Sequence, residues 1–491
     1  MSSLPAMIPL DRRWALTLPP YILAGLFFSV VLIGLARFSL HVPFFEDDLH
    51  LVRLYSPDEL QSVWQGPWDP DGLETRGFRP LTTWFNHLRA SLFGDSVGAH
   101  RLLLLALFAV YLSMAAALAR RVFDAAWAIG LLGGLLTALH VSSVFHYAWI
   151  ADGIHLLQGI FILCAILFAL RAVATGRTRW LFVSLLCIAL AMLTREDSVV
   201  VYPLTAFFVA VDLIRNRRWR TRRPVSLALY AAGGIGLFVM YWGWRAAVVP
   251  NATALQFSLG DWAWSMAQIV QNLGDRTNLV VWWPEYILLI DVWLVCLGIL
   301  VAAALFALPR PAQHQAAFWA ATLAIGALPG LTLARTNLLL IATTFWGLCL
   351  SSVLANLSKR SAWSWLCAVA IAVFVLWSSA IGSATLQTER NPASLEWICG
   401  ETSWIYGPYS HVTIPEPRHN LAAQRLYQFG ISSAGDLYAK LPDLIDEALT
   451  HHRYAPNDEG RPFIPRFAFI VYPGWSEWSC VTQPGGVYWK P

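Results

Sequence analysis

The sequence predicts an all-α polytopic membrane protein with about eleven transmembrane helices, followed by a small extracytoplasmic α+β domain. Of its 491 residues, 57% are hydrophobic and only 13% are charged, whereas a soluble protein has roughly a quarter of its residues charged. Apolar runs of about 18 residues or more recur from Tyr21 onward, and each can cross the roughly 30 Å hydrocarbon core as a helix. This composition excludes a soluble enzyme, a disordered scaffold and a nucleic-acid-binding module.

The transmembrane domain is expected to cover residues 1–385. Its predicted spans lie near residues 21–39, 101–119, 125–145, 154–170, 180–194, 198–214, 226–248, 286–308, 316–334, 336–355 and 362–385. The first apolar run has no small-residue cleavage site before Glu46, so we expect an uncleaved first span rather than a signal peptide.

Short basic connections between the spans predict the orientation. They contain Arg12 and Arg13, Arg120 and Arg121, Arg171 to Arg179, Arg215 to Arg223, Arg310, and Lys359 and Arg360. All fall on one side, which the positive-inside rule assigns to the cytoplasm together with the N-terminus. The loop at 41–100 and residues 386–491 then lie outside. Because lysine occurs only three times, a bias typical of GC-rich bacteria, we expect the bacterial inner (plasma) membrane.

Residues 386–491 differ in character from the spans. Proline, glycine and charge are scattered there, with a strand-like run at 467–472 and a short helix expected at 442–449. We therefore predict a soluble outer domain. Cys399 and Cys480 both fall in it and could be bridged or free.

The first outer loop opens with three adjacent acids, Glu46, Asp47 and Asp48, followed two residues later by His50. Like charge and partial desolvation favour their protonated forms, so one of them could act as a general base with a raised pKa. The alternative is a solvated loop that orients the first span. A divalent cation at these carboxylates also stays open, although too few oxygen ligands can be assigned to it.

Arg76 and Arg79 follow in the same loop, just before Pro80. Proline suits the first turn of a helix, so the two arginines would precede a helix on the outer side. A guanidinium there can pair with a carboxylate or bind a phosphate through two parallel hydrogen bonds. The alternative is an arginine held by lipid headgroups.

Further ionisable side chains recur at the outer ends of later spans, where they usually face a protein cavity. They are Asp152, Arg195, Glu196, Asp197, Arg245, Asp275, Arg276, Glu285 and Arg335. Together they predict one mixed-charge pocket on the outer side. A single member such as Asp197 is more typical of a structural ion pair than of a catalyst.

Metal and nucleotide motifs do not stand out. The spacing of His140, His146 and His155 matches no known metal-ligand pattern, and we expect these histidines on different sides of a span end. We therefore assign neither a metal nor another cofactor. Without a phosphate-cradling glycine loop, an activated group would have to arrive attached to a membrane lipid.

The outer-loop motifs resemble the GT-C superfamily of integral-membrane glycosyltransferases, specifically the protein O-mannosyltransferase-like branch and its bacterial relatives. Asp47-Asp48-Leu49-His50 is similar to the acidic pair of that branch, and Phe78-Arg79-Pro80-Leu81 to its aromatic-Arg-Pro-Leu element. Three further elements are similar: Trp149 with Asp152, Arg195-Glu196 with Pro203, and Arg335. The similarity covers roughly residues 20–205.

The resemblance implies transfer of a sugar from a polyprenyl-phosphate donor to an unknown outer-face acceptor, with inversion. It implies Asp47 as the base, supported by Asp48, with Asp152 also in the catalytic group. Arg335, Arg245 and Arg79 are candidates to bind the donor phosphate, in that order, and His50, Arg76, Arg195 and Glu196 would support them. The lipid donor and the surrounding membrane lipid are the expected partners, and no nucleic acid is expected.

Two other functions stay open at this point. A transporter or flippase of lipid-linked saccharides also needs a cavity lined with charges, and paired broken spans in two matching halves would favour it. A non-catalytic partner could bind lipid-linked glycan through the tryptophan-rich outer surface.

Overall fold

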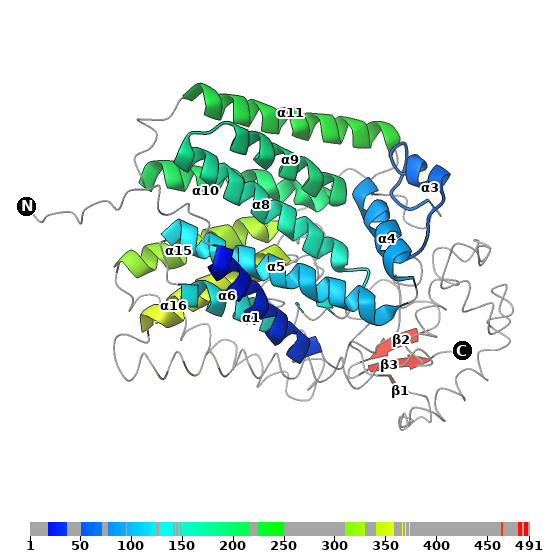
Figure 1. Ribbon diagram of the computed structural model, residues 1–491, viewed down its shortest axis with the longest axis horizontal. Helices are drawn as coiled ribbons and strands as arrows, with labels where there is room; N and C mark the ends of the chain where they lie inside the picture. The colour runs from blue at the N-terminus through cyan, green and yellow to red at the C-terminus, as the bar shows by residue number, and fades with distance from the viewer. Residues whose placement is uncertain are drawn as a thin grey trace, which may run out of the picture.

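The computed structural model describes most of the N-terminal 250 residues and parts of the remainder. The described ranges are 18–36, 51–70, 77–94, 96–123, 127–140, 143, 146–147, 149–215, 224–249, 310–328, 340–357, 366, 369, 373, 463–464, 480–483 and 486–489. Figure 1 shows that the long helices run roughly side by side and form one layered bundle. The chain is thus mainly helical, as predicted.

Helices occupy the predicted spans wherever the structure describes them. They are α1 (Leu18–Ala36), α5 (Val97–Phe123), α6 (Trp127–Leu139), α8 (Gly153–Thr175), α9 (Arg179–Thr194), η4 (Glu196–Val200) with α10 (Val201–Arg215), α11 (Pro224–Val248), α15 (Arg310–Gly326) and α16 (Leu340–Leu357). The predicted span at 286–308 and almost all of 362–385 lie outside the described residues.

Four of these segments are long and apolar enough to cross a membrane by themselves: Val97–Val122, Gly153–Thr175, Glu196–Ile214 and Val225–Val248. Two other apolar helices, α6 and α9, are shorter than these four, and α9 matches the short predicted span at 180–194. Helix α6 has 13 residues and α9 has 16, so at 1.5 Å per residue α9 is about 24 Å long, less than the roughly 30 Å hydrocarbon core. The long spans make this an integral membrane protein.

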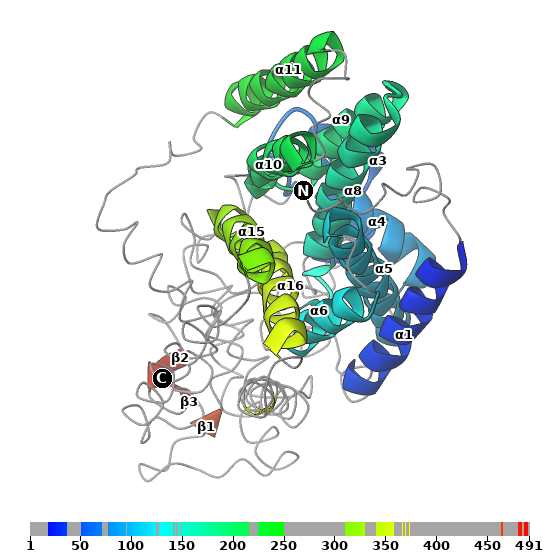
Figure 2. The same cartoon turned by 90° about the vertical axis from the view of Figure 1, so that its left-hand side faces the viewer.

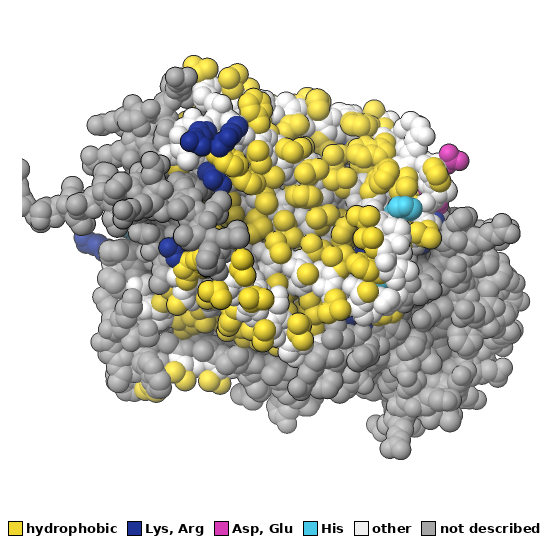
Figure 3. All heavy atoms as spheres, in the orientation of Figure 1, with side chains coloured by type: hydrophobic (Ala, Val, Ile, Leu, Met, Phe, Trp, Pro, Cys, Tyr) yellow, Lys and Arg dark blue, Asp and Glu magenta, His cyan; other side chains and the backbone are white. Residues whose placement is uncertain are grey.

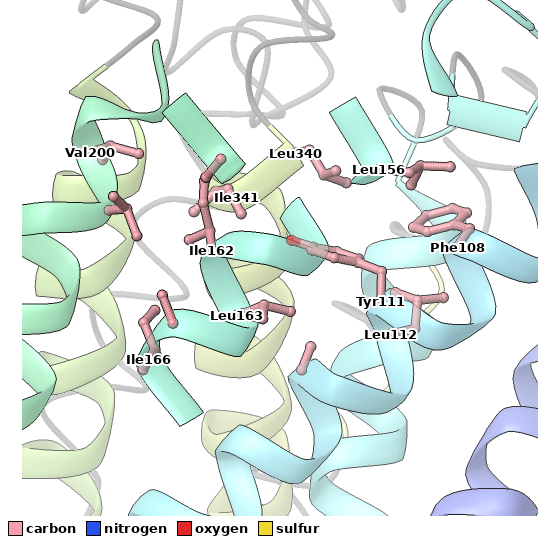
Figure 4. Close-up of a cluster of buried hydrophobic side chains, with 14 of the residues drawn as sticks. Phe108, Tyr111, Leu112, Leu156, Ile162, Leu163, Ile166, Val200, Leu340 and Ile341 are labelled. Atoms are coloured by element: carbon pink, nitrogen blue, oxygen red, sulfur yellow. The ribbon is translucent and has the colours of Figure 1, made fainter. Parts of the chain in front are cut away.

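Helix α8 lies at the centre of the bundle, where it packs against α5, α9 and α10. Its buried side chains belong to one apolar cluster with those of α5, η4 and α16, seen in Figure 4 around Ile162, Leu163 and Ile166. Within this cluster the hydroxyl of Tyr111 lies 2.6 Å from that of Thr344, so a hydrogen bond joins α5 to α16. The polar oxygen is thereby satisfied in an apolar interior.

The outer surface of the bundle is apolar. Helix α11 lies at one edge of it (Figure 2) and leaves large side chains such as Leu229, Val239 and Met240 mainly exposed. Figure 3 shows one continuous hydrophobic face, with basic side chains gathered at its left-hand end and histidine and acidic side chains at its right-hand end. A face of this size on a water-soluble monomer would be anomalous, and lipid is its natural solvent.

Helices α6 and α16 approach closely through glycine. A Cβ placed on Gly347 would lie 2.5 Å from the carbonyl oxygen of Gly133 and 2.6 Å from Oγ1 of Thr137. Earlier in α6, a Cβ on Gly130 would lie 2.7 Å from the carbonyl oxygen of Ala116 in α5. Small residues at these crossings allow the backbones to approach, as is typical of membrane helix pairs.

Two short outer helices complete the described N-terminal half. Helix α3 (Pro57–Ser62) begins with a capping box between Ser56 and Glu59, and Arg53 pairs with Glu59 at 2.8 Å. Burial alone would raise the pKa of Glu59, but the Ser56 N–H and the charge of Arg53 outweigh it and lower that pKa. Helix α4 (Pro80–Phe93) begins at the predicted proline.

Near the C-terminus the structure describes three short strands. They are β1 (Phe463–Ile464), β2 (Cys480–Gln483) and β3 (Gly486–Trp489), which form an antiparallel sheet in the order β1-β3-β2. Phe463 pairs with Tyr488, and Cys480 with Trp489. The predicted strand at 467–472 and helix at 442–449 lie outside the described residues, so the outer domain at 386–491 stays a prediction.

Gly347→Ala should lower the free energy of unfolding by about 1–3 kcal/mol, because the added methyl group overpacks the α6–α16 crossing. Gly236→Ala in α11 is the matched control, since a Cβ there meets nothing within 4 Å and alanine is the better helix former by up to about 1 kcal/mol. Thermal unfolding of the purified proteins in detergent measures the stability of both variants. Equal stability of the two variants would contradict the close approach.

Candidate active site

The structure describes five of the ten predicted site residues, all near the same end of the bundle. These are Arg79, Asp152, Arg195, Glu196 and Arg245. The other predicted residues, Asp47, Asp48, His50, Arg76 and Arg335, lie outside the described residues. Asp275, Arg276 and Glu285, which the sequence placed in the same pocket, also lie outside them.

Glu196 joins three elements at this end. Its Oε2 lies 2.6 Å from Nε of Arg79, and its Oε1 lies 3.8 Å from Nε of Arg245. The backbone N–H of Phe78 also donates to Oε1. Glu196 thus holds the start of α4 and the end of α11 against η4, and all three charged side chains are mostly buried.

Aromatic rings surround these two arginines. The guanidinium of Arg79 lies 5.6 Å from the ring centre of Trp68, and that of Arg245 lies 5.0 Å from Trp242. Phe78 packs between Tyr241 and Trp244 of α11, and the Tyr241 hydroxyl donates to its carbonyl oxygen at 2.8 Å. The rings fix the guanidinium planes and reduce their contact with water.

Arg195 forms a second set of contacts next to Glu196. Its Nε donates to Oδ1 of Asp197 at 3.1 Å, and its Nη1 donates to Nε2 of His155 at 3.0 Å. The side-chain amide of Gln158 donates to the same Asp197 oxygen at 2.9 Å. Burial lowers the pKa of Arg195, and the charge of Asp197 opposes this effect.

Asp152 precedes α8 and lies between two histidines. Nδ1 of His146 contacts its Oδ2, and Nε2 of His155 lies 3.3 Å from its Oδ1. Nε2 of His155 also faces Nη1 of Arg195. A guanidinium can only donate and a carboxylate can only accept, so Nε2 accepts from Arg195 when it is unprotonated and donates to Asp152 when it carries the proton. The carboxylate also lies at a helix N-terminus, where negative charge is favoured.

These contacts form one chain of charged and polar groups, which we call the ionic network. It consists of Arg79, Glu196, Arg245, Arg195, Asp197, Gln158, His155, Asp152 and His146. At the Glu196 end two guanidinium groups face one carboxylate. At the Asp152 end one carboxylate faces two imidazoles.

The structure corrects one expectation. His146 and His155 were expected on different sides of a span end, but both contact Asp152, with ring centres 6.1 Å apart. His140 lies elsewhere, against Trp346. In the part of the chain that the structure describes, no group of three or more His, Cys, Asp or Glu side chains is arranged to bind a metal ion.

Several side chains of the network were not predicted as site residues. The spacing of Asp152 and His155, three residues apart at a helix start, was the only local signal for that pair. Gln158 follows one turn later on the same helix. Trp68 and Tyr241 come from distant segments, and nothing in the local sequence connects them to Arg79.

Glu196→Ala should lower the free energy of unfolding by roughly 1–3 kcal/mol, because it removes the carboxylate that faces two partly buried guanidinium groups. Glu196→Gln should cost less, since its amide oxygen still accepts from the Phe78 N–H. Thermal unfolding in detergent compares the two variants with the wild type. Equal unfolding temperatures for the wild type and both variants would show that Glu196 does not hold α4 and α11 against η4.

One comparison with known proteins found a match. Residues 77–244 match the family model described as dolichyl-phosphate-mannose-protein mannosyltransferase, a range that runs from just before α4 to the last turns of α11 and contains every member of the ionic network except Arg245. No curated protein and no solved structure matches the chain. The match over residues 77–244 supports a relative of the GT-C glycosyltransferases, the superfamily that the sequence motifs resemble.

Proposed function

We propose that the protein transfers a sugar from a polyprenyl-phosphate-linked donor to an acceptor on the outer face of the membrane. The observation that carries the proposal is the ionic network, all of which except Arg245 lies within the matched residues, and in which two guanidinium groups lie apart from the buried carboxylate of Asp152. A glycosyl transfer needs both kinds of group, because negative charge develops on the phosphate leaving group while the acceptor hydroxyl loses a proton.

The arginines are suited to the phosphate. Arg79 and Arg245 both contact the Glu196 carboxylate, so two guanidinium groups lie together at this end of the ionic network. A guanidinium has five N–H donors in a planar fork and can contact a carboxylate and a phosphate together. Arg335, which the resemblance ranks first, would join them, and Arg195 and Glu196 would hold them in position.

The base is assigned from the sequence. In the proposed step the acceptor oxygen bonds to C1 of the sugar, the bond from C1 to the phosphate oxygen breaks, and the acceptor proton passes to Asp47. Asp48, His50 and Arg76 would support that carboxylate. Asp152, buried between two imidazoles, would be the second acid of the site.

The charge distribution favours the proposed orientation in the bacterial inner membrane. The ionic network lies at the start of α8 and the end of α9, whereas Arg171, Arg177 and Arg179 lie at the opposite ends of the same two helices. Under the positive-inside rule the basic end faces the cytoplasm. The network then faces outward, where a lipid-linked sugar replaces a soluble nucleotide donor.

The direct test incubates the purified protein with radiolabelled polyprenyl-phosphate sugars and membrane extract. We expect label to leave the lipid and appear in a protein, lipid or glycan acceptor. Label that only changes leaflet in sealed vesicles would support a flippase instead. The same assay with EDTA tests the divalent-cation alternative at Asp47 and Asp48, since a required metal would make transfer sensitive to the chelator.

Asp47→Asn should lower the transfer rate by about 10²–10⁴-fold, because the amide cannot accept the acceptor proton. Asp58→Asn is the matched control, since Asp58 is an exposed acid in α3 of the same outer loop. Expression and detergent stability should match the wild type in both variants. Full activity of Asp47→Asn would reject the catalytic assignment.

Arg335→Ala should raise the KM for the lipid donor more than the KM for the acceptor, because it removes a proposed phosphate contact. Arg310→Ala is the control, since Arg310 is exposed at the start of α15. Initial rates over a range of donor concentrations measure the change. An unchanged donor KM would argue against phosphate contact at Arg335.

A further inference from the structure

The inner face of α4 carries a polar side chain that the ionic network does not use. Asn86 is 1% exposed, and neither its Nδ2 nor its Oδ1 has a hydrogen-bond partner among the described residues. A buried polar group without a partner costs roughly 1–3 kcal/mol. Native proteins keep few such groups, so each one calls for an explanation.

The neighbours of Asn86 on α4 fix its position. Thr82, one turn earlier, donates to the carbonyl oxygen of Thr194 at 2.8 Å, and Arg89, three residues later, donates to that of Ile150. Residues spaced by four and three lie on one face of a helix. Asn86 therefore lies between the turn that carries Arg195 and the loop that carries Asp152.

Other contacts agree with this position. A Cβ on Gly153, the first residue of α8, would lie 3.4 Å from Arg89 and 3.6 Å from Phe85, so this stretch of α4 faces the start of α8. Nε2 of His146 and Nε1 of Trp68 are also buried without a partner among the described residues. Unused hydrogen-bonding groups thus gather on the segments around the ionic network.

We propose that the Asn86 amide hydrogen-bonds a hydroxyl group of the donor sugar. An amide offers both a donor and an acceptor, which a sugar hydroxyl can use together. Asn86 lies about two helical turns along α4 from Arg79, the proposed phosphate ligand, and the sugar is bonded directly to that phosphate. Because the Asn86 amide is buried, only a small group such as a sugar hydroxyl can reach it, whereas a bulky acceptor would need an exposed contact. The inference rests on the proposed function for the identity of the ligand.

The test measures binding rather than transfer. Purified protein in detergent is titrated with radiolabelled polyprenyl phosphate carrying mannose, glucose or galactose, and with polyprenyl phosphate without a sugar. The wild type should bind at least one sugar-bearing lipid more tightly than the bare lipid. Asn86→Leu should weaken that binding by about 10- to 100-fold, because one or two hydrogen bonds to the sugar are lost, and should leave bare-lipid binding unchanged.

Stability separates this role from a structural one. Leucine removes two unsatisfied polar atoms at similar volume, so Asn86→Leu should unfold at the same temperature as the wild type or higher. If the Asn86→Leu protein does not fold because leucine does not fit the site, Asn86→Ala is tested in the same binding assay. Asn356→Leu in α16 is the control, since its Nδ2 already donates to the Ser352 carbonyl oxygen at 2.7 Å, and sugar-lipid binding should not change.

Each outcome bears on the inference. Unchanged sugar-lipid binding in both Asn86 variants, an equal loss for bare lipid, or a wild type that gains no affinity from any sugar would overturn it. Sugar-dependent binding that needs Asn86, in a protein that transfers no label, would uphold the inference while the proposed transferase activity fails.

Discussion

The end of the bundle that carries the ionic network depends on the carboxylate of Glu196. Arg79, Arg245 and the Phe78 N–H converge on it from the start of α4 and the end of α11. Without that carboxylate, two guanidinium groups would face each other in a partly buried space, which costs several kcal/mol in such surroundings. The need to neutralise these two guanidinium groups therefore keeps the start of α4 close to the end of α11.

The same requirement extends along the ionic network. Arg195 and Asp197 flank Glu196 in the turn before α10 and connect it to His155 and Asp152 at the start of α8. Each bond satisfies a polar group that burial would otherwise penalise. Polar groups concentrate where helix ends meet, while the middle of the bundle, around Tyr111 and Ile162, is almost wholly apolar. In the part of the chain that the structure describes, the ionic network thus lies at one end of these helices.

Much of this arrangement could be predicted from single residues. Pro80 predicted the start of α4, and the acids and arginines at span ends predicted a shared polar region that brings together Arg79, Asp152, Arg195, Glu196 and Arg245. Which side chains pair could not be predicted. Arg79 and Glu196 are 117 residues apart, and the sequence ranked Arg79 as a phosphate ligand without naming Glu196 as its partner. The roles of Asp47 and Arg335 remain predictions.

The sequence by itself determined the membrane character, the approximate helix positions and the end of the bundle that carries charge, because hydropathy and basic-residue bias are local properties of a segment. Only the tertiary structure decided that His146 and His155 lie against Asp152, that α6 and α16 meet at glycine, and that Asn86 is buried without a partner. These facts depend on which helix faces adjoin and how closely, and packing between distant segments sets both.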